Sequence, residues 1–195
     1  MNCQEVHKIY HSLNSILPNG QLMLFLRSIL LFAFIDIMSI TGHFEFNNLQ
    51  CLTHDKEYVE FEYCYLKSMN RTYKYCSIKT ILHQLPLRSL NVKFKVLRRD
   101  TRTIFGKYDG TVNVCKFFKD GRNPAARIIF SVFTAYSNMN HTCPFNHDLM
   151  VDKLPVHYVN KIIASYVPDG RYFLNMSWYT ENIALADVIV YFTKS

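Results

Sequence analysis

The residues best suited to chemistry lie in one short stretch, Ser137–Asp148, which reads SNMNHTCPFNHD. Histidine and cysteine are common zinc ligands, and a Cys–His pair can also act as a nucleophile with its base. The spacing His141-x-Cys143-x3-His147 lacks the second cysteine pair of a zinc site, and a nucleophilic cysteine must be a free thiolate. The chain contains neither G-x-S-x-G nor H-E-x-x-H. The pattern therefore predicts no metal, no cofactor and no catalysis.

The same stretch has the composition of a stapled turn. Its turn-forming residues are Asn138, Asn140, Pro144 and Asn146. Asn140 also begins an Asn-x-Thr glycosylation triplet, and Cys143 is expected to be half of a disulfide. We expect the neighbouring His147 and Asp148 to hydrogen-bond to each other or to the backbone. These features favour a stapled, glycosylated turn over a reactive cluster.

A leader is predicted before the folded part of the chain. The segment Leu22–Gly42 combines a short apolar run with the basic Arg27 before it and small residues at Ser39 and Thr41, which is typical of a signal peptide. A membrane span would need roughly 18 or more uncharged apolar residues, so a cleaved leader is favoured over an anchor.

The start of the chain is consistent with this leader. Met23 would begin a leader of ordinary length and is favoured over Met1 as the initiator. The sequence predicts an N-terminal extension and signal peptide over residues 1–41. It predicts one extracellular, secreted β-rich domain over residues 42–195, with no stable membrane span in the mature chain.

Cysteines and glycosylation triplets fit export to an oxidising compartment. Cys3 falls in the predicted leader, which leaves an odd number of cysteines: Cys51, Cys64, Cys76, Cys115 and Cys143. One of them must stay free or pair with another molecule. Glycosylation triplets begin at Asn70, Asn140 and Asn175, and together they predict a glycoprotein with these asparagines on its surface.

The charge balance is basic, at a formal +7 at pH 7. The lysines and arginines are scattered through strand-like patterns, and no run of five or more occurs. This distribution does not predict nucleic-acid binding in a secreted protein. It supports weak attraction to anionic surfaces or ligands.

Apolar alternation predicts strands along most of the mature chain. Residues 43–67 predict two strands around a polar turn near Thr53–Lys56, and such a hairpin would bring Cys51 and Cys64 close together. Residues 71–84 also alternate, with one face formed by Thr72, Lys74, Cys76, Ile78, Thr80 and Leu82. Residues 91–100 form the cleanest strand, whose core face carries Val92, Phe94 and Val96.

The next segments predict a strand, one helix and two closing strands. Residues 106–118 predict a turn at Asp109-Gly110 followed by a strand through Val112, Val114 and Cys115. The period then changes over 123–137, where Asn123 can cap a helix that has Pro124 at its first position. Its expected apolar stripe is Ala125, Ile128, Ile129, Val132, Phe133 and Tyr136. A short helical turn is expected near 154–160, and the closing strands lie within 166–195.

Two consequences follow for the architecture. The chain is predicted to be mainly β, an antiparallel sandwich with one α-helix around residues 123–137. Cys115 precedes that helix and Cys143 follows it, so a bond between them would clip the helix to the sheet and contribute about 2–4 kcal/mol.

Aromatic residues exceed what a small sandwich needs to fill its core, with 13 Tyr and 15 Phe in the chain. Small-molecule sites are concave and rich in such side chains, which predicts that some of them line a pocket. The alternative is that they simply fill the core and cover the sheet faces. The candidate ligand-binding residues are Phe61, Tyr63, Tyr65, Phe94, Phe133 and Trp178.

Several strings resemble a large insect family of small secreted proteins, catalogued as domain of unknown function 1091. The strings are NLQC, EFEYCYLKSMNRTYKY, VCKFFKDGRNPAARIIFSVF and YSNMNHTCPFNHDLMVDKLP. The resemblance spans residues 44–193. It implies that Cys51, Cys64, Cys115 and Cys143 are the family's usual cysteines, which singles out Cys76 as an addition. The chain departs from the family pattern in the stretch RDTRTIFGKYDGTVNVC.

The family is similar, more distantly, to insect chemosensory proteins related to the ganglioside activator. That similarity implies a lipid-recognition fold, an immunoglobulin-like β-sandwich cup that holds an acyl chain between its sheets, but it carries no binding residues across. The leading expectation is a non-enzymatic protein that binds a lipid or small hydrophobic ligand between its sheets. The alternative is an extracellular protein- or glycan-recognition module that uses exposed aromatics. Four cysteines allow three pairings, so the connectivity stays open.

Overall fold

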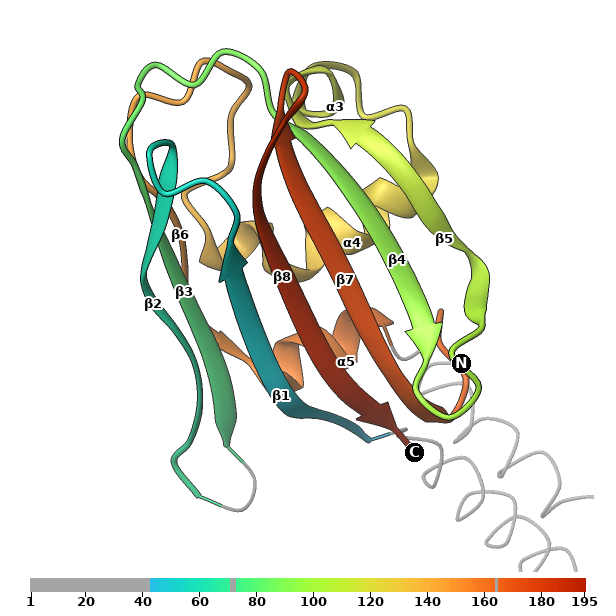
Figure 1. Ribbon diagram of the computed structural model, residues 1–195. Coiled ribbons are helices and arrows are strands. Elements are labelled where there is room, and N and C mark those ends of the chain that lie inside the picture. Colours follow the sequence, from blue (N-terminus) through green and yellow to red (C-terminus); the bar gives the residue numbers. More distant parts are fainter. Residues whose placement is uncertain (1–42, 71–72, 164) are drawn as a thin grey trace, which may run out of the picture. The chain divides into compact units, whose positions relative to one another are not determined.

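The computed structural model describes residues 43–70, 73–163 and 165–195. This part of the chain is mainly β, with two antiparallel sheets in a sandwich-like arrangement and three α-helices (Figure 1). The predicted fold class is confirmed. The expected leader over residues 1–41 and the choice between Met1 and Met23 lie outside the described residues.

The two sheets are unequal in size. The larger sheet has the strand order β1-β8-β7-β4-β5, and the smaller has the order β2-β3-β6. The strands of the larger sheet are β1 (Phe44–Thr53), β8 (Ile183–Lys194), β7 (Gly170–Thr180), β4 (Asn91–Arg98) and β5 (Ile104–Asn113). Those of the smaller sheet are β2 (Val59–Ser68), β3 (Lys74–Leu82) and β6 (Leu149–Pro155). Apolar side chains from both sheets meet in one core between them.

The predicted hairpin over residues 43–67 is wrong. β1 pairs with β8, and β2 pairs with β3, so the short connection after Thr53 carries the chain from one sheet to the other. Two amphipathic strands joined by a polar turn fit either arrangement locally. Here each strand buries its apolar face by facing the opposite sheet. Cys51 and Cys64 still meet, with a Cα–Cα distance of 6.3 Å, and their disulfide joins the two sheets.

β4 follows the predicted pattern, whereas β5 does not. Val92, Phe94 and Val96 are all buried, as their alternation predicts. Asp109 and Gly110 are not a turn, because they lie inside β5 opposite Lys95 and Phe94 of β4. Ladder pairing along the whole strand therefore outweighs the local turn propensity of an Asp-Gly pair.

The chain turns into a helix where a strand was predicted to continue. α3 (Val114–Asp120) begins because the Oδ1 atom of Asn113 accepts a hydrogen bond from the backbone N–H of Lys116, at 2.8 Å. It ends at Gly121, whose φ of 61° is the left-handed conformation that favours glycine. Val114 and Cys115 are therefore helical, and α3 was missing from the prediction.

Two further helices lie against the inner face of the larger sheet (Figure 1). The predicted helix over residues 123–137 is observed as α4 (Pro124–Phe133) and a short 3-10 turn, and the Asn123 side chain caps it at 2.9 Å from the Ala126 nitrogen. The second is α5 (Val156–Ile163), where a short turn was expected. The fully buried residues of α4 are Ala126, Ile129, Phe130 and Phe133, so its stripe is rotated slightly from the predicted one.

A buried lysine closes one end of the larger sheet. The side chain of Lys194 is 7% exposed, and its ammonium lies 2.8 Å from Asp169 Oδ1. We expect Asp169→Asn to lower the free energy of unfolding by about 1.5–3 kcal/mol, because a buried ammonium loses its charged partner. Urea denaturation measures this change.

A matched control is available in Asp100→Asn. Asp100 pairs with Arg171 at 2.6 Å, but both side chains are more than half exposed, at 57% and 59%. The control is expected to cost less than about 1 kcal/mol. Equal costs for the two substitutions would show that burial of Lys194 does not matter to stability.

Candidate functional site

An apolar cavity of about 180 Å³ lies between the two sheets and the helices α4 and α5. None of its lining side chains is charged. Its volume is slightly above the roughly 150 Å³ of a dry apolar cavity that takes up benzene. It is below the roughly 300–1,000 Å³ of pockets for drug-sized ligands. The cavity has room for a small apolar ring or a short hydrocarbon chain.

Both sheets and both helices supply the walls. The larger sheet contributes Val96 from β4, Met176 from β7 and Val188 from β8. The smaller sheet contributes alternate residues of β3, which are Cys76, Ile78, Thr80 and Leu82. α4 and α5 contribute Ile129, Phe133, Val159 and Ile163. These elements position the cavity because each turns its apolar face toward the same interior.

Three of the six predicted ligand-binding residues line this cavity. Phe61, Phe133 and Trp178 lie in its wall. Phe94 does not, although it shares the buried face of β4 with Val96; it is 1% exposed and belongs to the packed core. Their role in ligand binding stays a prediction.

Tyr63 and Tyr65 do not line the cavity either. The register of β2 against β3 shifts between Phe61 and Tyr63, which reverses the alternation of side chains after that point. Phe61 therefore faces the interior, whereas Tyr63 and Tyr65 lie together on the outer face, with ring centroids 5.6 Å apart. The alternation of residue types along the sequence does not reveal this shift in register.

Most of the lining that sequence reasoning missed is aliphatic. The prediction selected aromatic residues, but aliphatic side chains such as Ile78, Leu82 and Val188 also line the cavity. A usable signal was present in residues 71–84, where Cys76, Ile78, Thr80 and Leu82 were predicted to share one face. That shared face is the one that lines the cavity.

Cys76 is a free thiol in the wall of the cavity. It is 5% exposed, and burial raises the pKa of its thiol to about 12. The side chain therefore stays protonated and unreactive at physiological pH. A buried thiol cannot reach a second chain while the domain is folded, so Cys76 does not link two copies of the folded protein.

The cavity approaches the surface beside the edge strand β5. Tyr166, which follows α5, is 50% exposed although it contributes to the cavity wall. Tyr108 of β5 also lines the cavity, and burial raises the pKa of Tyr108, with a smaller contribution from the Tyr166 phenol. These two tyrosines mark the rim of the cavity.

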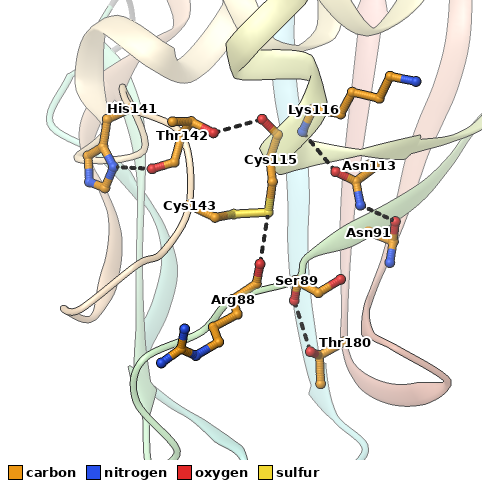
Figure 2. Close-up of a disulfide and its surroundings, with 10 residues drawn as sticks. All are labelled: Arg88, Ser89, Asn91, Asn113, Cys115, Lys116, His141, Thr142, Cys143 and Thr180. Carbon is orange, nitrogen blue, oxygen red and sulfur yellow. Dashed lines mark hydrogen bonds between the residues drawn. A yellow bond between two sulfur atoms is a disulfide. The ribbon is translucent and has the colours of Figure 1, made fainter.

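The stretch Ser137–Asp148 forms a stapled turn (Figure 2). Its staple is the disulfide between Cys143 and Cys115 of α3, and the Thr142 hydroxyl donates to the Cys115 carbonyl at 2.8 Å. The bond therefore ties α3, rather than a strand, to the segment after α4. Asp148 accepts a hydrogen bond from the Leu82 backbone at 3.0 Å.

The histidines of this turn contact each other and the backbone. His141 Nε2 and His147 Nε2 are 3.0 Å apart, and His147 Nδ1 lies 2.8 Å from the Asp148 carbonyl oxygen. Cys143 is unavailable as a ligand because it is in a disulfide. In the ranges that the structure describes, no group of three or more His, Cys, Asp or Glu side chains is placed to hold a metal ion.

The three predicted glycosylation acceptors lie in different surroundings. Asn70 is exposed at the end of the β2–β3 hairpin, and Asn140 is exposed in the stapled turn. Asn175 lies in the middle of β7, is half-buried, and its buried Oδ1 has no hydrogen-bond partner within the described ranges. Glycosylation stays a prediction at all three positions, and Asn175 is the least accessible of them.

Comparison with known families bears on the segment that holds the stapled turn and α4. Residues 92–174 match a family model described as protein of unknown function (DUF1091). The match covers β4, β5, all three α-helices and the Cys115–Cys143 disulfide, and it supports the resemblance to the DUF1091 family seen in the sequence. No curated protein matches the chain.

Within the part of the chain that the structure describes, no helix is long and apolar enough to cross a membrane.

Proposed function

We propose that this protein is a secreted, non-enzymatic carrier that binds a small hydrophobic ligand between its two sheets. The observation that carries the proposal is the uncharged cavity of about 180 Å³ in the middle of the sandwich. A well-packed core leaves few voids larger than a water molecule, so an interior space of this size is unusual. A chemosensory role, as in the insect proteins that the family resembles, is the physiological setting we propose.

The composition of the walls supports an apolar class of ligand. Among the lining residues, hydroxyl groups occur at Thr80 and at the rim tyrosines, Tyr108 and Tyr166. The interior therefore offers shape and apolar contact rather than a network of polar anchors. It suits a compact ring or a short hydrocarbon chain, and its volume is too small for the whole of a two-chain lipid.

Secretion is supported by the covalent structure. The bonds Cys51–Cys64 and Cys115–Cys143 are both formed. Disulfides of this kind form and persist in oxidising compartments, which fits the predicted leader and the glycosylation triplets. We propose an extracellular glycoprotein, with the exposed Asn70 and Asn140 as its accessible acceptors.

The proposal predicts that filling the cavity abolishes binding. Ala186, near the start of β8, lines the cavity and is 4% exposed. Ala186→Phe would place a ring in the space that the ligand needs. We expect the affinity for the neutral fluorophore N-phenyl-1-naphthylamine to fall at least about tenfold, since most apolar contact is lost. Fluorescence titration measures the affinity.

Ala184→Phe is the matched control, because Ala184 lies on the same strand and is exposed. Its probe affinity should equal that of the unmodified protein. Thermal unfolding of both variants separates loss of binding from loss of folding. An unmodified protein that binds no probe and carries no co-purifying small molecule in native mass spectrometry would refute the carrier function.

A second candidate function is recognition of a protein or glycan at the outer face of the smaller sheet. There Tyr65 and Tyr73 are 39% and 36% exposed, and Tyr75 joins their rings at centroid distances of 6.4 and 6.0 Å. Exposed aromatics are enriched at recognition surfaces. Ala186→Phe leaves this face unchanged, so retention of biological activity in that variant would favour the second candidate.

A further inference from the structure

We propose that the ligand is a single-chain amphiphile with an anionic head group, held with its tail in the cavity and its head beside Lys116. This inference rests on the proposed carrier function and deepens it. It follows from a second hollow, a surface groove of about 710 Å³ formed by β5, α3 and the start of α4.

The groove and the cavity meet at the same two side chains. Tyr108 of β5 and Ile128 of α4 line both hollows. Tyr108 and Ile128 therefore form the boundary between the interior space and the surface. A linear molecule that passes between these side chains would occupy both hollows, which extends the length of chain that the protein can hold.

The chemistry changes across this boundary. The cavity has no charged residue in its wall, whereas Lys116, Asp120 and Arg122 all line the groove. A ligand that spans both hollows is therefore apolar at one end and polar at the other. The sign of the polar end depends on which of these charges are already neutralised.

The carboxylate of the groove is neutralised locally. Asp120 accepts a hydrogen bond from the Arg122 backbone N–H at 3.3 Å, and its other oxygen lies 3.8 Å from Arg122 Nε. Lys116, in contrast, forms no ion pair with any described residue, and its side chain is drawn extending away from the disulfide in Figure 2. The cation without a partner is therefore the one that faces a ligand head group.

The amide oxygens of the groove are also engaged. Asn113 Oδ1 accepts from the Lys116 backbone, and Asn123 Oδ1 accepts from the Ala126 backbone, at 2.8 and 2.9 Å. These are the uncharged acceptors that would otherwise repel an anion. Both oxygens already accept hydrogen bonds in helix caps. The groove therefore presents the unpaired Lys116 ammonium, which favours a carboxylate or another single anionic group.

The head-group contribution should be modest and sensitive to salt. Lys116 is exposed, and ion pairs at exposed sites are weakened by solvent and by dissolved ions. The apolar tail supplies most of the affinity, and Lys116 supplies the preference for an anion over a neutral molecule of equal length. Decanoate and 1-decanol are suitable probes, since they share a ten-carbon chain and differ in head-group charge.

The experiment measures displacement of N-phenyl-1-naphthylamine by decanoate and by 1-decanol from the unmodified protein and from Lys116→Glu. We expect the variant to bind decanoate about three- to tenfold more weakly and to bind 1-decanol unchanged, because reversal of an exposed charge acts on the anion alone. Raising the salt concentration should weaken binding of decanoate in the unmodified protein and leave 1-decanol unaffected.

Lys119→Glu is the matched control. Lys119 lies on the same helix and undergoes the same change of charge, but it does not line the groove. It should bind both probes as the unmodified protein does. Equal loss of decanoate in both lysine variants would assign the effect to overall charge and overturn the site at Lys116.

Different results would overturn the head-group site at Lys116 and the carrier function. Binding of both probes with no effect of Lys116→Glu would overturn the anionic head-group site and leave the carrier function intact. Displacement by neither probe, together with an empty protein in native mass spectrometry, would overturn the carrier function itself. Equal weakening of both probes by Lys116→Glu would also contradict a charge-specific role for Lys116.

Discussion

Phe94→Ala is expected to lower the free energy of unfolding by about 3–5 kcal/mol, the range for removing a phenylalanine ring from a packed core. Phe94 is 1% exposed and lies on β4, which pairs with both β5 and β7. A methyl group built on Gly110 of β5 would lie 3.6 Å from Phe94 Cζ, so the ring packs closely over the neighbouring strand. Urea unfolding followed by fluorescence of the single tryptophan, Trp178, measures the change.

Phe173→Ala serves as the matched control on the adjacent strand. Phe173 is half-buried on the outer face of β7, where its ring lies 5.7 Å from that of Tyr191. We expect its loss to cost less than half as much, because solvent replaces part of the space that the ring leaves. Similar costs for the two substitutions would show that burial of the Phe94 ring adds little to stability. A charged residue at position 94 is therefore expected to prevent folding and export, rather than to remove ligand binding alone.

Removal of the Cys51–Cys64 disulfide, in the double variant Cys51→Ser/Cys64→Ser, is expected to cost about 2–4 kcal/mol. The bond closes a loop with a sequence separation of 13 residues and joins β1 of the larger sheet to β2 of the smaller one. Both sheets line the cavity, so we also expect weaker binding of N-phenyl-1-naphthylamine by the folded variant. Thermal unfolding and fluorescence titration of the purified variant measure the two effects.

The control removes a cysteine that forms no disulfide. Cys76→Ala deletes a buried thiol and should cost about 1 kcal/mol, the usual scale for a small change in a core. A double variant no less stable than Cys76→Ala would show that the disulfide contributes little to holding the sheets together. Normal probe affinity in a destabilised double variant would separate stability from the shape of the cavity.

The sequence by itself determined the class of the fold and several local features. Alternation at Val92, Phe94 and Val96 identifies a strand with one buried face, because side chains of a strand point to opposite sides in turn. The pair Asn123-Pro124 identifies the start of α4, because the asparagine side chain accepts the N–H that the first turn leaves unpaired. These features depend on neighbours in the chain, and a single sequence contains them.

Only the tertiary structure decided which elements face each other. β1 and β2 have the local pattern of a hairpin, yet they belong to different sheets, since both must bury their apolar faces in one core. The register shift after Phe61 moves Tyr63 and Tyr65 to the outer face, and pairing with β3 produces that shift. The cavity likewise exists because Ala186, Ile129 and other distant residues leave space between them. Contacts of this kind join residues far apart in the chain, so local patterns do not reveal them.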